Sequence, residues 1–206
     1  MYWFIHKMNN LFGKGREKIL EFFYLNKFKE SYFSEILKET NLTPNTTLNH
    51  LKVLQKSNLI ISTKKTNNTF YKLNKAEPLV YSILSYFDFK KFNSLPSERK
   101  SAISSFLEKI NVKPLIVLLF GSTATNNFSK ESDIDLLLIF NKKELKNKKL
   151  LEDIEAVTGV KIQTFVIDLE YFEDQILRNE DKVVSHAIKT GYPVNGFEQV
   201  YKRIIK

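Results

Sequence analysis

The sequence predicts an α+β protein of two domains: helices and a hairpin in the N-terminal third, then an α/β domain with a mixed sheet. The chain has 206 residues, enough for two small domains. Residues 1–75 carry 13 lysines and arginines against 5 aspartates and glutamates, whereas residues 76–206 carry 19 against 18. Two apolar runs, at 115–120 and 136–140, are typical of strands covered on both faces.

Composition excludes several kinds of chemistry. The chain contains no cysteine, so disulfides, cysteine-bound zinc and thiol catalysis are absent. No stretch approaches the length of a membrane-spanning helix, and we expect a cytoplasmic protein without a membrane partner. The net charge of +9 lies almost entirely in the first 75 residues, which indicates a polyanionic partner for that part of the chain.

The N-terminal third reads as three helices followed by a hairpin. Apolar spacing predicts a helix over 16–26, and a second helix beginning at Ser34 and ending before Asn41. Thr43 is a suitable N-cap and Pro44 a suitable first residue for a third helix, with Leu48, Leu51 and Leu54 turned inward. Strands are expected at 59–63 and 69–73, with 64–68 as the tip of the hairpin.

The third helix leaves short polar side chains outward, which suits contact with base edges in a DNA major groove. Asparagine can pair with adenine, threonine can contact a thymine methyl, and lysine can reach phosphate or guanine. Two lysines at the hairpin tip would lie near a phosphate backbone. The predicted contacts to double-stranded DNA are Asn45, Thr46, Asn49, His50, Lys52, Lys64 and Lys65.

Three helices followed by a basic hairpin resemble the winged helix-turn-helix fold of ArsR-like and MarR-like transcription regulators. The resemblance covers about 15–74, and the piece LNHLKVLQKSNLI is similar to the recognition helix and its exit. It implies a DNA-binding domain at 1–75. The alternative is a helix-hairpin module that binds protein or serves only as a structural appendage.

A linker helix is expected next, at 76–96, with one strong apolar face formed by Leu79, Val80, Ile83, Leu84 and Phe87. Winged-helix regulators often dimerise through such a helix, which would make the protein a homodimer; alternatively, the face packs on one of the two domains. The Asn-Ser-Leu-Pro segment at 93–96 breaks the pattern and marks the predicted domain boundary, so that the second domain spans 97–206.

The second domain is organised around the segment 115–140. A helix from Ser97 to Ile110 leads into a buried strand, which ends at Gly121-Ser122. A second buried strand begins with Asp133-Ile-Asp135. Side chains alternate along a strand, so the two carboxylates point the same way with Cα atoms roughly 6.5–7 Å apart. Such a like-charged pair calls for a cation between the two, or for raised pKa values.

Magnesium suits this arrangement, because Mg²⁺ binds carboxylate oxygens and usually keeps waters and substrate phosphates as further ligands. Gly121 would let a phosphate approach the backbone, Ser122 offers a hydroxyl, and the amides of Ser122 and Thr123 could open a helix N-terminus. Alternatively, the aspartates cap a strand and Gly-Ser is an ordinary turn.

Gly-Ser, ten intervening residues and then Asp-Ile-Asp between two apolar strands resemble the signature of the minimal nucleotidyltransferases of the DNA-polymerase-β-like superfamily. Ser132 and Leu136 also match the consensus pattern of this family motif. The resemblance implies that Asp133 and Asp135 are catalytic and bind Mg²⁺ or Mn²⁺. It also implies a nucleoside triphosphate, with ATP as the expected nucleotide, whose phosphates lie against Gly121 and Ser122.

Two residues depart from the family pattern. Asn126 stands where a glycine is common, and asparagine tolerates the left-handed conformation. Gln163 stands where a third carboxylate is expected on a later strand. An amide cannot accept a proton from an attacking hydroxyl, so Gln163 cannot act as a general base. It also lacks the carboxylate that would help to bind a second metal ion. Asp168 and Glu170 are possible substitutes, although both are expected to lie past the strand.

The remaining elements complete the predicted α/β domain. A helix is expected at 142–158, ended by Gly159, and a strand at 160–167. One or two helices follow at 169–189, then a short edge strand at 191–196 and a terminal helix.

Two functions follow from these patterns. The first is a DNA-binding protein whose second domain transfers a nucleotidyl group to the hydroxyl of a partner protein, as in the toxin–antitoxin members of the family, or of a small molecule. The second is a transcription regulator whose second domain is catalytically degenerate, and either binds nucleotide or only preserves the fold. A polymerase or RNA-tailing enzyme is disfavoured, since nothing beyond the minimal core is present to hold a primer.

Overall fold

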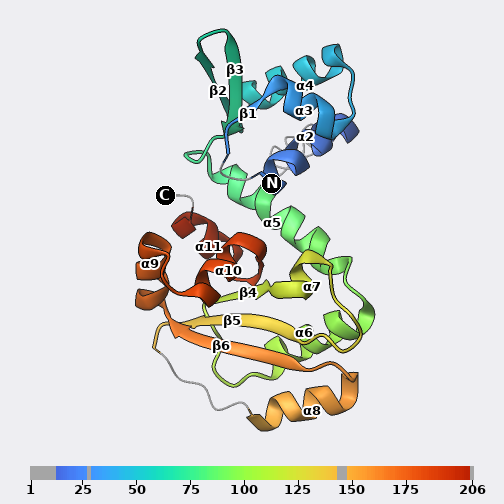
Figure 1. Cartoon of the computed structure of the whole chain (residues 1–206), viewed down its shortest axis with the longest axis vertical. Helices are drawn as coiled ribbons and strands as arrows, with labels where there is room; N and C mark the ends of the chain where they lie inside the picture. Colours follow the sequence, from blue (N-terminus) through green and yellow to red (C-terminus); the bar gives the residue numbers. More distant parts are fainter. Residues whose placement is uncertain (1–12, 27–28, 143–147, 205–206) are drawn as a thin grey trace, which may run out of the picture. The chain divides into compact units, whose positions relative to one another are not determined.

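The computed structural model describes residues 13–26, 29–142 and 148–204 of the chain (Figure 1). The chain divides into two compact units, one reaching to Phe87 and the other running from Asp88 to Ile204. The division falls inside helix α5 (Pro78–Asn93), the segment that the sequence assigns to a linker helix. Among the described residues, no helix combines the length and the apolar character needed to cross a bilayer.

The first unit contains the three expected helices: α2 (Lys14–Leu25), α3 (Phe33–Thr40) and α4 (Pro44–Lys56). Helix α4 begins as predicted, with the Thr43 side chain accepting a hydrogen bond from the amide of Thr46. Helix α3 begins one residue before Ser34, and the amide of Tyr32 donates to Glu35 Oε2 over 3.0 Å. The three helices pack together, and their largest fully buried side chains are Ile19, Leu20, Phe23, Ile36, Leu51 and Leu54.

The hairpin consists of β2 (Ile60–Lys65) and β3 (Asn68–Leu73), paired antiparallel as expected (Figure 1). Lys65 pairs with Asn68, so the turn has two residues and both strands are longer than predicted. A short strand that the sequence did not indicate, β1 (Ser31–Tyr32), pairs with β3 and gives the sheet the order β1-β3-β2. Three helices and this sheet form the predicted winged helix-turn-helix arrangement.

The second unit is built on a four-stranded mixed sheet of order β6-β5-β4-β7. Its strands are β4 (Ile116–Phe120), β5 (Ile134–Phe140), β6 (Ile162–Asp168) and β7 (Tyr192–Asn195). β5 runs antiparallel to β4 and parallel to β6, while β7 pairs antiparallel with β4. This mixed sheet confirms the predicted fold class.

Helices cover both faces of the sheet, which explains the unbroken apolar runs. On one face, Val117, Leu119, Leu136 and Leu138 pack against α6 (Ser97–Lys109) and α8 (Lys148–Thr158). On the other face, Ile116, Leu118, Leu137 and Ile139 pack against α9 (Leu169–Arg178), α10 (Lys182–Thr190) and α11 (Phe197–Ile204) (Figure 1). The helix predicted over 142–158 is α8, and 143–147 lie outside the described residues.

Candidate functional site

The two aspartates of the Asp-x-Asp motif lie at the start of β5. Asp135 is the second residue of the strand and pairs with Phe120, the last residue of β4, while Asp133 immediately precedes the strand. Asp135 shares a face of the sheet with Phe120 and Leu137, which is the face covered by α9, α10 and α11. The pleat therefore directs both carboxylates to that face, as the sequence indicated.

Gly121 lies directly against one of these carboxylates. Its φ is +71°, a conformation that side chains rarely adopt, and a Cβ placed there would lie 2.3 Å from Asp135 Oδ2. Any larger residue would therefore displace the Asp135 carboxylate as well as strain the backbone. The glycine of the Gly-Ser pair is required by the aspartate across the strand ladder.

Gly121 also opens α7 (Gly121–Thr125), a helix of five residues. Asn126 ends it with φ of 57°, the left-handed conformation that the sequence anticipated for asparagine at this position. The Thr125 hydroxyl donates to the carbonyls of Gly121 and Ser122, over 3.1 and 3.2 Å. Because a helix this short has little macrodipole, the anion site expected at its N-terminus rests on individual amides and the Ser122 hydroxyl alone.

The residues beside the two aspartates are a lysine and an amide. Gln163 on β6 pairs in parallel register with Asp135, and the Lys161 carbonyl accepts the amide of Ile134 over 2.8 Å. Lys161 Nζ lies 3.1 Å from Asp133 Oδ2. Gln163 therefore occupies the position at which the family resemblance led us to expect a third carboxylate.

Neither alternative carboxylate reaches the site. Asp168 pairs with Phe140 at the far end of the same two strands, about 17 Å along the ladder from Asp135. Its side chain caps α9 by accepting the Tyr171 amide over 2.8 Å. Glu170 lies in the first turn of α9. Across the described residues, no group of three or more histidines, aspartates and glutamates is placed to hold a metal ion.

The electrostatic environment of Asp135 is that of a crowded carboxylate. Burial and the neighbouring charge of Asp133 raise its pKa, and His186 acts in the opposite direction. His186 comes from α10 and its ring lies edge-on to Phe120, with 6.0 Å between the ring centroids. Nothing in the sequence singles out this histidine, because its place near Asp135 depends on how α10 crosses the sheet.

A buried arginine supports the site from the other side. Arg99 of α6 is 3% exposed and donates to the Thr123 hydroxyl over 2.7 Å. It also donates to the carbonyls of Ser129 and Ser132, over 3.0 and 2.7 Å. Thr123 in turn donates to the Asp133 carbonyl over 3.3 Å. One guanidinium thus joins α7 to the loop that leads into Asp133, a role that an arginine at the start of an amphipathic helix does not reveal in the sequence.

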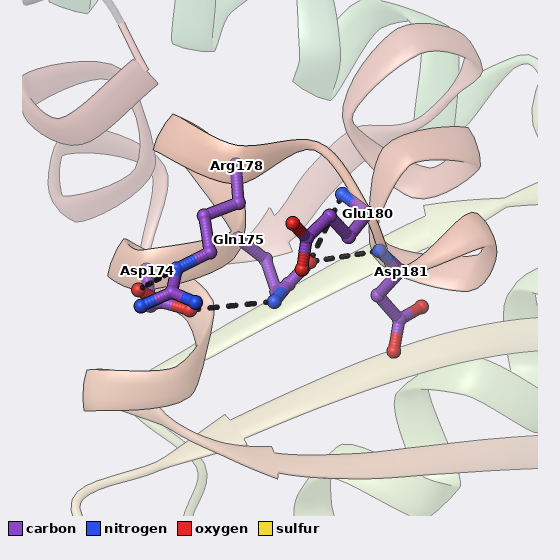
Figure 2. A network of polar contacts seen from close by, with 5 residues as sticks. All are labelled: Asp174, Gln175, Arg178, Glu180 and Asp181. Carbon is purple, nitrogen blue, oxygen red and sulfur yellow. Dashed lines mark hydrogen bonds and ion pairs between the residues drawn. The ribbon is translucent and has the colours of Figure 1, made fainter.

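The position of α10, and so of His186, is fixed by a polar network at the turn after α9 (Figure 2). The buried Gln175 accepts the amides of Glu180 and Asp181 over 3.2 and 2.8 Å. Asp181 then caps α10 by accepting two amides of its first turn. On the outer side, Arg178 pairs with Asp174 over 2.7 Å. These contacts hold the two helices at one geometry over the sheet.

The candidate nucleic-acid face lies on α4 in the first unit. Asn45, Asn49 and Lys52 are exposed on one side of the helix. The inward residues differ by one from expectation: Thr47 is fully buried, with its hydroxyl donating to the Thr43 carbonyl over 3.0 Å, and Leu48 is 38% exposed. Leu48 therefore belongs to the outward side, between the asparagines.

Two of the predicted contact residues are engaged within the unit. Thr46 receives a 2.8 Å hydrogen bond from the Thr43 hydroxyl at the helix cap. His50 is half-buried against α2, where a Cβ on Gly15 would lie 2.2 Å from its Nε2. Burial, with a contribution from Arg16, lowers the pKa of His50. His50 and Thr46 thus have structural contacts whatever they do toward DNA.

The two hairpin lysines also differ. Both lysines are exposed, but Lys65 also forms an ion pair with Glu30 and lies 5.0 Å from the centroid of the Phe70 ring. Glu30 also pairs with Lys72 over 2.8 Å, and the two lysines lower the pKa of Glu30 to about 2. Lys65 therefore helps to hold the hairpin, while Lys64 projects from the other face of the strand.

Asp133 and Asp135 are the residues that would hold the expected Mg²⁺ or Mn²⁺, and two carboxylates on one face are chemically compatible with such an ion. Mg²⁺ is commonly bound by one or two carboxylates together with substrate phosphates and waters. On the neighbouring strand, the positions beside the two aspartates carry the amide Gln163 and the cation Lys161, neither of which supplies a further carboxylate.

Comparison with known families gives one match in each part of the chain. Residues 101–188 match the family model described as polymerase beta, nucleotidyltransferase. Residues 14–62 match the model described as bacterial regulatory protein, arsR family. One part of the chain is therefore similar to ArsR-type regulatory proteins and another to polymerase beta nucleotidyltransferases, the two resemblances that the sequence motifs predicted.

Two solved structures are also similar to parts of the chain. A mutant of MepR from S. aureus bound to an oligodeoxyribonucleotide is 18% identical, with a TM-score of 0.34, over 53% of this chain and 94% of that one. Wild-type ZitR from Lactococcus lactis in complex with DNA is 23% identical, with a TM-score of 0.27, over 45% and 70%. No curated protein matched the chain.

Proposed function

We propose that this protein binds double-stranded DNA through its first domain and uses its second to transfer a nucleotidyl group from a nucleoside triphosphate to a hydroxyl. The observation that supports transfer is the contact between Gly121 and Asp135, which places a Gly-Ser turn against a pair of like-charged carboxylates. ATP is the expected nucleotide, and the acceptor is the hydroxyl of a partner protein or a small molecule.

In the proposed reaction the acceptor oxygen attacks the α-phosphorus, the bond from that phosphorus to the bridging oxygen breaks, and pyrophosphate leaves. Asp133 and Asp135 would hold Mg²⁺ or Mn²⁺, which when bound neutralises charge developing on the phosphates. Gly121 and Ser122 would contact the phosphates through amides and the serine hydroxyl. Gln163 cannot take the acceptor's proton, so the proton passes to solvent.

The first domain would use the exposed face of α4 in a major groove, with Asn45, Asn49 and Lys52 toward the bases and Lys64 toward a phosphate. Support comes from the basic excess of residues 1–75 and from the exposure of these four side chains. Asn49→Ala should then change sequence preference more than overall affinity, as measured by selection from a random duplex library. An unchanged preference would argue against base contact by this residue.

A second function is favoured by the pairing of Asp135 with Gln163. Here the protein is a DNA-binding regulator, and the second domain binds nucleotide without transferring it. An amide in place of the third carboxylate removes the group best placed to activate an acceptor hydroxyl, while the Gly-Ser turn and both aspartates remain.

Transfer can be tested with nucleoside triphosphates labelled at the α-phosphate, supplied with Mg²⁺ or Mn²⁺ to the purified protein and to a cell lysate. The matched control is the Asp133→Asn, Asp135→Asn variant, which keeps the size of both side chains. Label that appears only with the intact aspartates supports transfer and identifies the acceptor. Absence of label with every nucleotide, together with measurable DNA binding, would favour the regulator.

A further inference from the structure

At the start of β6, a positive residue, Lys161, and an uncharged polar residue, Gln163, lie beside the two aspartates of the Asp-x-Asp motif. Ile134 pairs with Ile162 and Asp135 with Gln163, so that Lys161 lies next to Asp133 one step earlier in the ladder. Lys161 Nζ is 3.1 Å from Asp133 Oδ2, within ion-pair distance. Asp-Ile-Asp on one strand thus faces Lys-Ile-Gln on its neighbour.

This pairing changes the charge that the site offers to metal ions. Two carboxylates supply two negative charges, and Lys161 already offsets one of them at Asp133. Two divalent ions would bring four positive charges next to that lysine, without any further described carboxylate to bridge them. A single divalent ion that arrives with the negative phosphates of a nucleotide is compatible with the lysine.

We propose that Lys161 is a resident cation of this site, holding Asp133 until one nucleotide-bound divalent ion replaces it. The proposal rests on the proposed nucleotide site and adds its metal stoichiometry and the order of binding. Once Asp133 turns to the metal, the ammonium is free to contact phosphate oxygens. Metal binding without nucleotide is weak, because the ion competes with a tethered cation, and nucleotide and metal increase each other's affinity.

The test measures Mn²⁺ binding by electron paramagnetic resonance, with and without an ATP analogue that cannot be cleaved between the α- and β-phosphates. The wild-type chain is expected to hold one Mn²⁺ when the analogue is present. Lys161→Met should raise affinity for Mn²⁺ alone by about 2- to 5-fold, as expected for removal of a partly exposed ion pair, and lower affinity for the analogue.

The matched control is Lys202→Met. Lys202 pairs with Glu198 over 2.7 Å on α11, and its side chain is 55% exposed against 59% for Lys161. The control removes the same charge at similar exposure and should leave Mn²⁺ binding as in the wild type.

Two results would overturn the inference while leaving the proposed function intact: two bound Mn²⁺ per wild-type chain, or equal affinity for Mn²⁺ alone in Lys161→Met and wild type. Failure of every variant to bind Mn²⁺ even with the analogue would overturn both. Because Lys161 is exposed and its neighbour Ile162 supplies the packing, the substitution should not prevent folding.

Discussion

Gln163 is the direct neighbour of Asp135 across the parallel pair of β5 and β6, and it is exposed. Strand neighbours in register point to the same face, so a carboxylate at 163 would lie beside Asp135. Replacing Gln163 with aspartate is therefore the substitution that would most directly add a carboxylate to the site.

Gln163→Asp should add a metal ligand. We expect the variant to bind a second Mn²⁺ in the presence of a nucleotide analogue, with a spin-coupled signal in electron paramagnetic resonance, and to increase any nucleotidyl transfer. Gln163→Asn is the control, since it has the same size without the charge. An unchanged stoichiometry in the aspartate variant would show that the geometry around residue 163 does not admit a second ion.

Arg99 should contribute strongly to stability and to the shape of the site. Arg99→Met leaves the Thr123 hydroxyl and two carbonyls without their buried donor, and should lower the free energy of unfolding by about 3 kcal/mol. Chemical denaturation would measure the decrease. Lys100→Met, on the same helix, is the control; a decrease of the same size there would assign the effect to the helix surface.

The two hairpin lysines should respond differently to charge reversal. Lys64→Glu should weaken binding to all duplexes and reduce the slope of log affinity against log salt by about 0.9 for each phosphate that the lysine no longer neutralises, without changing the melting temperature. Lys65→Glu should also lower the melting temperature, because it places a second carboxylate beside Glu30. If the double reversal left affinity at physiological salt unchanged, the hairpin would not contact DNA.

The contacts of Glu30 predict its pH dependence. Its pKa is lowered from 4.5 to about 2, chiefly by hydrogen bonds from Lys65 and Lys72. A lowered carboxyl pKa stabilises the fold above the unfolded value, and that stability is lost as the pH falls from about 4.5 toward about 2. NMR titration of the Glu30 carboxyl should give a midpoint near the lower value. A midpoint near 4.5 would show that the two ion pairs do not persist in solution.

The sequence predicted most of the second domain because its central strands are long, apolar and bounded by Gly, Ser and Asn. Asp133, Asp135 and Gly121 could be proposed as site residues from the sequence because their spacing belongs to consecutive elements. Arg99 and His186 were missed because each reaches the site from a helix distant in sequence, where an arginine or histidine is usually a surface residue. The missed strand β1 has only two residues and no periodicity to detect.

In the first domain, the helices and hairpin were predictable, but the inward side of α4 was misjudged at one position. Leu48 was expected inside, and Thr47 was not included among the inward residues, since threonine is usually the more exposed of the two residue types. Thr47 is buried because its hydroxyl bonds to the carbonyl one turn earlier. Such a local bond removes the cost of burying the hydroxyl, and hydrophobic periodicity does not register it.

The alternation of side chains along β6 places core packing and the charge beside the aspartates on different residues. Ile162 is 4% exposed and packs in the core, while the residues on either side of it, Lys161 and Gln163, are exposed and lie beside Asp133 and Asp135. The charge at those two positions can therefore change over evolution, or by design, without altering the sheet. Two substitutions at these positions would change the charge beside the aspartates while leaving the buried side of the strand as it is.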